Sequence, residues 1–153
     1  MQIKKLENRP VEIEAVAKMI YGEFVEKTQS KATMEDIVFY LSHPNEKQFP
    51  YSLVALEGEK YIGTVSIFEQ DIKERSHYTP CLASLYVEQD YRKNGIGTQL
   101  INEVTKIVRN LGYKEIFLKT ETARKFYERI GWTYLETMTD EFGEDSYLFK
   151  LSL

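Results

Sequence analysis

The chain has 153 residues, of which 42% are hydrophobic, 13% aromatic and 29% charged, with a formal net charge of −4. These values predict a single domain over residues 1–153 and argue against a nucleic-acid binder, which usually carries a basic excess. One cysteine, Cys81, excludes an intrachain disulfide, and with only two histidines we expect no metal site. Residues 1–16 lack the apolar core of a signal peptide and no apolar run is long enough for a membrane span, so we expect a cytoplasmic protein without a membrane partner.

The N-terminal part of the chain is predicted to be mostly helical. Residues 2–6 alternate apolar and polar side chains, as in a short strand. Pro10 suits the first turn of a helix whose apolar residues recur at helical spacing as far as Phe24. A second helix is predicted to begin at Thr33, because its hydroxyl can cap the helix while Asp36 stands three residues further on.

The middle of the chain is predicted to be rich in strands. After a loop over residues 43–50, residues 51–70 have the pattern of a β-hairpin that turns at residues 57–60. Residues 71–80 are polar and are predicted to form a loop. Residues 81–88, CLASLYVE, are typical of a buried strand.

The C-terminal half alternates helices and strands. A helix is predicted from Ile96, with its apolar residues on one face, to Gly112, which closes it. The elements that follow are a strand (114–119), a helix (121–131) and two strands (132–138 and 145–153) around a turn. This order predicts an α/β (α+β) layered domain with a mixed sheet, in which residues 81–119 form a right-handed parallel crossover.

Two glycines, Gly95 and Gly97, stand at the start of the helix that follows the buried strand. Glycine at a helix start costs about 1 kcal/mol relative to alanine, so a compensating role is expected. The first turn of a helix has unpaired N–H groups and a partial positive charge, and Arg92, Lys93 and Thr98 add donors. Together these groups suit a phosphate or diphosphate. The alternative is a tight strand-to-helix turn without a ligand.

Two common nucleotide motifs do not fit this segment. A P-loop needs four residues between its glycines and a Gly-Lys-Ser/Thr end, and the segment has neither. A dinucleotide-binding fingerprint needs a third glycine where Leu100 stands. Another nucleotide-dependent transferase therefore remains only as a rival hypothesis.

Two motifs together resemble the GNAT superfamily of N-acyltransferases. Residues 92–97 match Arg-x-x-Gly-x-Gly, and residues 123–132 match Ala-x-x-x-Tyr-Glu-x-x-Gly-aromatic. Their order, with one helix and one strand between them, is that of the family, and the similarity covers nearly the whole chain. It implies one domain with a mostly antiparallel mixed sheet, a splayed central parallel strand pair and about four flanking helices.

The resemblance implies an enzyme that transfers an acetyl group directly from acetyl-coenzyme A (acetyl-CoA) to a primary amine, without an acyl-enzyme and without a metal. The central strand would pair with the pantetheine arm, and Thr120 stands where the family often has an asparagine. Lys125 and Arg129 would meet the adenosine phosphate, or form an ordinary solvated helix face. The residues implied at acetyl-CoA are Leu85, Val87, Arg92, Lys93, Asn94, Gly95, Ile96, Gly97, Thr98, Thr120 and Lys125.

For the chemistry, Tyr127 occupies the family's general-acid position; its alternative role is that of a packing aromatic. Its unperturbed pKa of ~10 exceeds the ~8.5 of a thiol, so a hydrogen bond to the departing thiolate is more plausible than full proton donation. His77 is the candidate base because imidazole titrates near neutrality. Glu69 or Glu88 acting through water, or bulk solvent, are the alternatives. Cys81 lies in an apolar strand and is expected to be core.

The acceptor is left open between a small cationic molecule and a protein amine. An acidic and aromatic set favours a cationic amine, although surface helices are normally charged. This set comprises Tyr21, Glu23, Phe24, Glu26, Glu35, Asp140, Glu141 and Phe142. Family members often pair as dimers, so a homodimer is a further alternative, without an interface signature in this sequence. A non-catalytic module that senses acyl-CoA is the main rival hypothesis.

Overall fold

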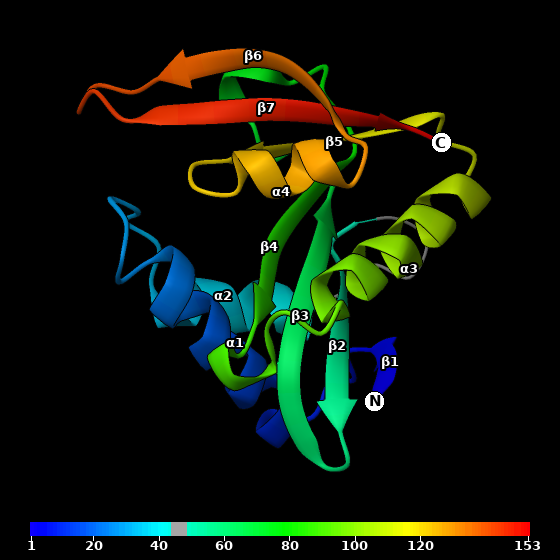
Figure 1. Ribbon diagram of the computed structural model, residues 1–153. Coiled ribbons are helices and arrows are strands. Elements are labelled where there is room, and N and C mark those ends of the chain that lie inside the picture. Colours follow the sequence, from blue (N-terminus) through cyan, green and yellow to red (C-terminus); the bar gives the residue numbers. More distant parts are fainter. Residues whose placement is uncertain (44–48) are drawn as a thin grey trace.

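The computed structural model describes residues 1–43 and 49–153, and these form one layered α/β structure (Figure 1). Its strands make a single sheet in the order β1-β2-β3-β4-β5-β7-β6. All neighbouring strands are antiparallel except β4 and β5, which are parallel. The predicted mixed, mostly antiparallel sheet is therefore confirmed. The strands are β1 (Gln2–Lys5), β2 (Tyr51–Glu57), β3 (Lys60–Phe68), β4 (Cys81–Val87), β5 (Glu115–Thr120), β6 (Thr133–Thr139) and β7 (Asp145–Ser152).

The helices lie on both faces of the sheet, with α1 and α2 to one side of β4 and α3 to the other (Figure 1). They are α1 (Pro10–Phe24), α2 (Met34–Ser42), α3 (Ile96–Asn110) and α4 (Arg124–Arg129). The predicted capping box is present, because Thr33 Oγ1 accepts from the Asp36 N–H and Asp36 accepts from the Thr33 N–H. None of the helices in the described ranges has the length and apolar character needed to cross a membrane.

One predicted helix is shorter than expected, and one predicted loop lies partly outside the described residues. The helix expected over residues 121–131 is shorter, because residues 121–123 form a turn in which Thr120 Oγ1 accepts from the Ala123 N–H at 3.1 Å. The loop expected over residues 43–50 includes residues 44–48, which lie outside the described part of the chain.

The core has two main parts because strand side chains alternate between the faces of the sheet. On β2, Leu53 and Ala55 join the cluster beneath α3, while Val54 and Leu56 join the cluster beneath α1 and α2. Cys81 is fully buried in a third cluster with Ile72, which confirms that it is a core residue.

The central feature of the sheet is the separation of β4 from β5. These strands pair at a single position, Cys81 with Phe117, next to a hydrogen bond from the Phe117 N–H to the Pro80 carbonyl at 3.0 Å. Beyond it β4 stays paired with β3, whereas β5 follows β7 along its whole length. A register shift opposite β3 and a left-handed Ser84 (φ 56°) mark a bulge in β4. The two strands therefore form a V whose apex is the Cys81–Phe117 pair.

A buried carboxylate joins the N-terminal elements to the sheet. Glu12, 1% exposed at the start of α1, accepts from Lys4 Nζ and Arg9 Nη2, each at 3.1 Å. It also accepts from the Glu7 N–H at 2.9 Å and from the Tyr61 hydroxyl at 3.2 Å. Burial alone would raise the pKa of Glu12, but these hydrogen bonds outweigh it and lower the pKa below 4.5.

Replacing Glu12 by Gln is expected to lower the free energy of unfolding at pH 7 by about 2 kcal/mol, because two cations lose their shared carboxylate. Since the pKa of Glu12 is lower in the folded than in the unfolded state, its contribution is present above the unfolded-state value and is lost as pH falls through the folded-state value. The difference between wild type and variant should therefore shrink on acidification, as measured by urea unfolding. Glu14→Gln, which breaks only an exposed pair with Lys18, is the control and should cost less than about 0.5 kcal/mol.

Candidate functional site

The bend between β4 and α3 has the shape of an anion-binding concavity. Lys93 and Gly95 both have left-handed backbones, with φ of 67° and 77°. In the part of the chain that the structure describes, the N–H groups of residues 93–98 donate no hydrogen bond; the first donor in the helix is Gln99, to the Gly95 carbonyl at 3.0 Å. Successive free N–H groups in such a bend, at the positive end of a helix, bind anions.

The predicted side-chain donors next to the bend brace its backbone. Arg92 Nε donates to the Val87 carbonyl at 2.8 Å, and its guanidinium lies 5.4 Å from the centre of the Tyr86 ring. Asn94 Nδ2 donates to the Tyr91 carbonyl at 3.2 Å. These side chains therefore hold the shape of the bend, and its backbone N–H groups are the free donors.

Gly97 occupies a place where packing alone does not require glycine. A Cβ atom there would lie 3.9 Å from both Phe126 Cζ and Val87 Cγ2, an ordinary van der Waals distance, and the backbone φ is not left-handed. By contrast, Gly95 needs its left-handed φ although a Cβ there would meet nothing within 4 Å. A side chain larger than a methyl group at position 97 would therefore extend from the helix start beside the bend, next to Val87 of β4 and Phe126 of α4.

The edge of β4 that faces β5 is free beyond the apex of the V. The side chains of Leu85 and Val87 pack against the core beneath α3, as expected, while no strand among the described residues pairs with this edge beyond Cys81. An unpaired edge can accept an extended ligand as an additional strand. The free edge leads directly to the bend, so the two predicted binding elements are continuous.

Tyr127 on α4 lies on the α3 side of the sheet and is 5% exposed. Its ring centre is 5.7 Å from that of Trp132 and 6.0 Å from that of Phe149, both edge-on or tilted. Burial raises the pKa of Tyr127 well above its usual 10, so the phenol is neutral at physiological pH. Tyr127 is thus a packing aromatic whose hydroxyl keeps its proton at neutral pH.

Thr120 and Lys125 are the remaining residues predicted to bind acetyl-CoA. The Thr120 hydroxyl already serves the turn before α4, as described above. Lys125 is exposed on α4, as expected of either role proposed for it.

His77 is not brought together with Tyr127. It is exposed in the loop between β3 and β4, with its ring centre 4.5 Å from that of Tyr78. Tyr78 in turn stacks on Phe117 at 4.7 Å, on the face of the sheet opposite the cluster that holds Tyr127.

Glu136 on β6 holds this loop against the sheet. It accepts from Arg75 Nε and Nη2 at 2.9 and 2.6 Å and from the Tyr78 hydroxyl at 2.9 Å. The hydrogen bond from Arg75 is the main reason why the pKa of Glu136 is lowered.

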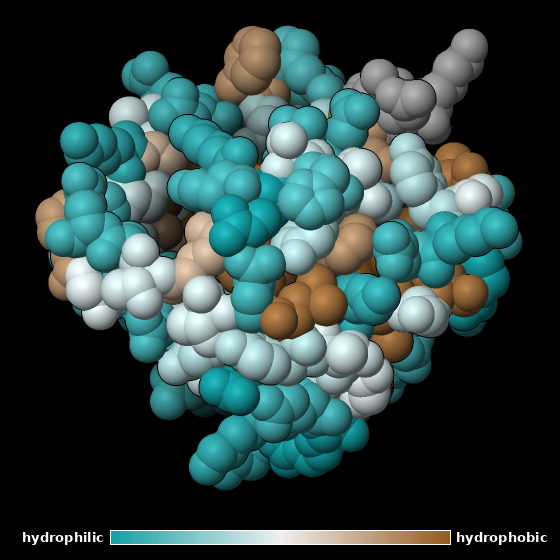
Figure 2. Space-filling model, turned by 90° about the horizontal axis from the view of Figure 1, so that it is seen from above, coloured by the Kyte–Doolittle hydropathy of each residue, from teal (hydrophilic) through white to brown (hydrophobic). Residues whose placement is uncertain are grey.

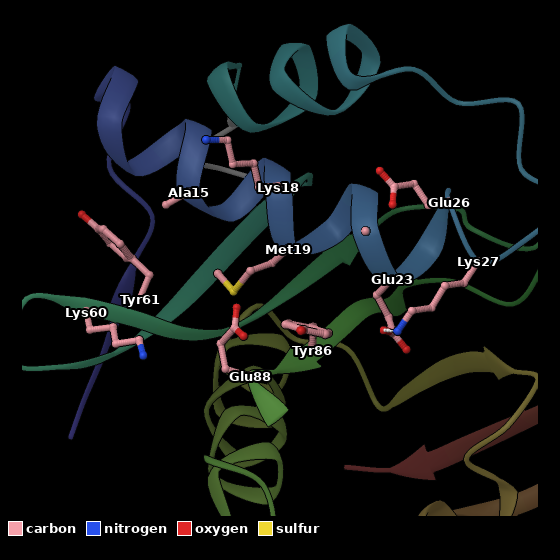
Figure 3. Close-up of a pocket in the computed structure, with 11 residues that line it drawn as sticks. Ala15, Lys18, Met19, Glu23, Glu26, Lys27, Lys60, Tyr61, Tyr86 and Glu88 are labelled. Atoms are coloured by element: carbon pink, nitrogen blue, oxygen red, sulfur yellow. Dashed lines mark hydrogen bonds and ion pairs between the residues drawn. The ribbon is translucent and has the colours of Figure 1, made fainter. Parts of the chain in front are cut away.

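A groove of about 650 Å³ runs between α1 and the sheet (Figure 3). Met19 of α1 lies on one wall, and Tyr86 and Glu88 from the end of β4 lie on the other. Glu23 and Glu26, two members of the predicted acidic set, line its far end, where Glu23 pairs with Lys27 at 2.9 Å. The groove is therefore acidic at one end but contains cations as well.

The rest of the predicted acidic and aromatic set lies on three elements. Tyr21 and Phe24 are on α1, Glu35 is on α2, and Asp140, Glu141 and Phe142 are in the turn between β6 and β7. Asp140 caps the turn between β6 and β7, because its Oδ1 accepts from the Phe142 and Glu144 N–H groups at 2.8 and 2.9 Å. This turn leaves the Phe142 side chain 59% exposed. Seen from the end where β6 and β7 lie, the surface is mainly hydrophilic with small apolar areas (Figure 2).

Sequence reasoning did not single out three residues near the apex of the V. Ser84 has the left-handed backbone of the bulge, Tyr40 on α2 has a buried hydroxyl, and Asp71 is a partly buried carboxylate. The sequence around Ser84 carries no glycine that would signal a positive φ. Asp71 stands in a polar stretch that resembles any surface loop. Among the described residues, no group of three or more His, Cys, Asp or Glu side chains could hold a metal ion.

The sequence matches the Acetyltransferase (GNAT) family over residues 13–132. It is 32% identical over 115 residues to "N-alpha-acetyltransferase 30" of Schizosaccharomyces pombe, covering 72% of this chain and 73% of that protein. It is 30% identical over 83 residues to the human protein of the same name, of which it spans 23%. The chain therefore belongs to the GNAT acetyltransferase family.

Solved structures show the same fold. The chain superposes on an aminoglycoside 6'-N-acetyltransferase complexed with coenzyme A with a TM-score of 0.80 and 18% identity, covering 99% of this chain and 97% of that one. It also superposes on yncA from Salmonella typhimurium, solved with its cofactor acetyl-CoA, with a TM-score of 0.77 and 16% identity over 100% and 94% of the two chains. At these identities the likeness establishes the GNAT fold.

Proposed function

We propose that this protein transfers the acetyl group of acetyl-CoA directly to an amine, and that the amine is the α-amine of a peptide or protein. The observation that carries the proposal is the continuity between the free edge of β4 and the unpaired N–H groups of residues 93–98. An extended arm that ends in a diphosphate matches this arrangement. The coenzymes present in the two superposed structures support the choice of acetyl-CoA.

Each predicted binding residue has a distinct role in this proposal. The N–H groups from Lys93 to Thr98 hold the diphosphate, and Arg92 and Asn94 shape the bend from behind. The backbone of Leu85 and Val87 pairs with the pantetheine arm. Thr120 borders the arm near α4, and Lys125 approaches the adenosine phosphate.

The α-amine is favoured as acceptor because the relative with 32% identity is named for transfer to an α-nitrogen. A small polyamine or aminoglycoside is the second candidate, supported by the acidic residues along the groove beside α1 and by the name of one superposed structure. A direct transfer is favoured because burial raises the pKa of Cys81 to about 11, which keeps this thiol protonated and weakly nucleophilic. A cytoplasmic location and a possible dimer remain predictions from the sequence.

The proposal is tested by acetyl-CoA binding and turnover together. Wild type should bind acetyl-CoA in isothermal titration, and thiol release should be fastest with peptides that carry a free α-amine, compared with polyamines and aminoglycosides. Gly97→Val should weaken acetyl-CoA binding by roughly tenfold or more without lowering the melting temperature, because its side chain enters the space beside the bend. Gly22→Val on α1, where a Cβ meets no atom within 4 Å, is the matched control for acetyl-CoA affinity and melting temperature only, because Gly22 lines the groove beside α1.

Each result that contradicts the proposal would favour a different alternative. Binding of acetyl-CoA without turnover of any amine would favour the sensing module. Unchanged affinity in Gly97→Val would remove the bend from the binding site, and preferential binding of another nucleotide would favour the rival transferase.

Tyr127→Phe is expected to bind acetyl-CoA as wild type does and to lower kcat by roughly 10- to 100-fold, because the departing thiolate loses a hydrogen-bond donor. The neutral state of the buried phenol predicts that this loss is the same across neutral pH. Steady-state kinetics with the best acceptor provide the measurement, with Tyr113→Phe, between α3 and β5, as the control. Wild-type turnover in Tyr127→Phe would leave Tyr127 with its packing role alone.

A further inference from the structure

The loop between β3 and β4 places a carboxylate beside the apex of the V. Phe68, at the end of β3, pairs with Cys81, and Cys81 pairs with Phe117 at the single contact between β4 and β5. Ile72 is buried in the same cluster as Cys81 and Phe117, and the Cys81 thiol lies against the backbone of Asp71 and Ile72. Asp71 is therefore next to the point where the two central strands separate.

The Asp71 carboxylate is partly buried and lacks a partner. Within residues 1–43 and 49–153 it makes no hydrogen bond and no ion pair. Burial raises the pKa of Asp71, and the positive charge of Lys119 on β5 offsets only part of this effect. A carboxylate in this condition binds a proton more readily than an exposed one, which suits a group that accepts a proton from a substrate.

Three titratable groups from three elements interact electrostatically with Asp71: Tyr40 from α2, Cys81 from β4 and Lys119 from β5. Burial raises the pKa of Tyr40 to about 12 and that of Cys81 to about 11. Both are therefore neutral at physiological pH. Lys119 is the cation among these three, and it makes no ion pair with Asp71 in the described structure.

A second polar group without a partner lies at the same place. The Tyr40 ring packs edge-on against Phe68 at 5.1 Å, and its hydroxyl approaches the hydroxyls of Ser66 and Ser84. Among the described residues that hydroxyl is buried and completes no hydrogen bond. Unpaired buried polar atoms are uncommon in folded proteins. The Tyr40 hydroxyl, beside a partly buried carboxylate that also has no partner among the described residues, therefore indicates that a polar ligand completes the arrangement.

Resting on the proposed acetyl transfer, we infer that Asp71 is the catalytic residue that accepts a proton from the ammonium form of the acceptor. Loss of this proton frees the nitrogen lone pair, which forms the C–N bond to the acetyl carbon while the C–S bond breaks. The second proton lost by the nitrogen ends on the coenzyme thiolate, and the proton on Asp71 returns to solvent. The products are the amide, the free thiol and one released proton.

Asp71 suits this role better than the bases suggested by the sequence. His77 is exposed and held against Tyr78, and Glu88 lies in the groove at the far end of β4 from the apex. A carboxylate next to the apex is within the region where the free edge of β4 begins, whereas His77 and Glu88 lie outside it. Glu69 follows Phe68 close to the apex, but its side chain is exposed, whereas Asp71 is partly buried.

The test compares wild type with Asp71→Asn, using acetyl-CoA and the acceptor that gives the highest turnover. At about pH 6.5 the variant should lose at least ~50-fold in kcat/KM for the acceptor, because a positioned base contributes about 10² or more. The loss should shrink to within about fivefold near pH 9.5, where solution supplies the neutral amine. Acetyl-CoA affinity should be unchanged, and the melting temperature equal or higher, since the amide removes a buried charge.

Two further variants complete the experiment. Asp71→Glu should restore part of the activity at the lower pH, and Glu74→Gln, an exposed carboxylate in the same loop, should behave as wild type. An equal loss at every pH, or no loss at all, would overturn the assignment of Asp71. Absence of acetyl transfer by wild type would instead refute the proposed function.

Discussion

The structure depends on one constraint: β4 and β5 are parallel neighbours that pair at a single position, Cys81 with Phe117. Each strand has a stronger attachment elsewhere, β4 to β3 and β5 to β7, so the sheet stays continuous while its centre opens. The open edge leaves backbone groups of β4 without a strand partner. A protein interior rarely tolerates such groups unless water or a ligand satisfies them.

The two faces of the sheet present different polar groups at this opening. On the α3 side, the bend at residues 93–98 offers free N–H groups, and the buried Tyr127 stays neutral. On the other face, α2 and the loop held by Glu136 bring Tyr40 and Asp71 to the apex. In the proposed function the opening joins these faces, with the acyl donor entering from one and the amine from the other.

Much of this arrangement could be predicted from sequence because its signals are local. The order of elements follows from periodicity, the Thr33–Asp36 box from capping chemistry, and the bend from glycines next to cations. The two motifs identified the family, which the match over residues 13–132 confirms. The side-chain roles of Arg92 and Asn94 as braces were not predicted, because they depend on carbonyls whose direction only the folded chain defines.

The residues at the apex could not be predicted for the same reason. Asp71 and Tyr40 are 31 positions apart in the sequence, and neither belongs to a local motif. They are distinguished by burial and by the lack of partners among the described residues, which are properties of the tertiary structure. The positive φ of Ser84 is likewise set by the bulge in the sheet rather than by a residue type that favours it.

The central claim is that the opening between β4 and β5 is where the thioester donor lies, and a crystal structure with acetyl-CoA tests it most directly. The account predicts density for the diphosphate against the N–H groups of residues 93–98 and for the pantetheine arm along Leu85 and Val87, with the acetyl group near the apex. Density for acetyl-CoA at another place, with the bend and the edge of β4 in contact with solvent alone, would contradict it.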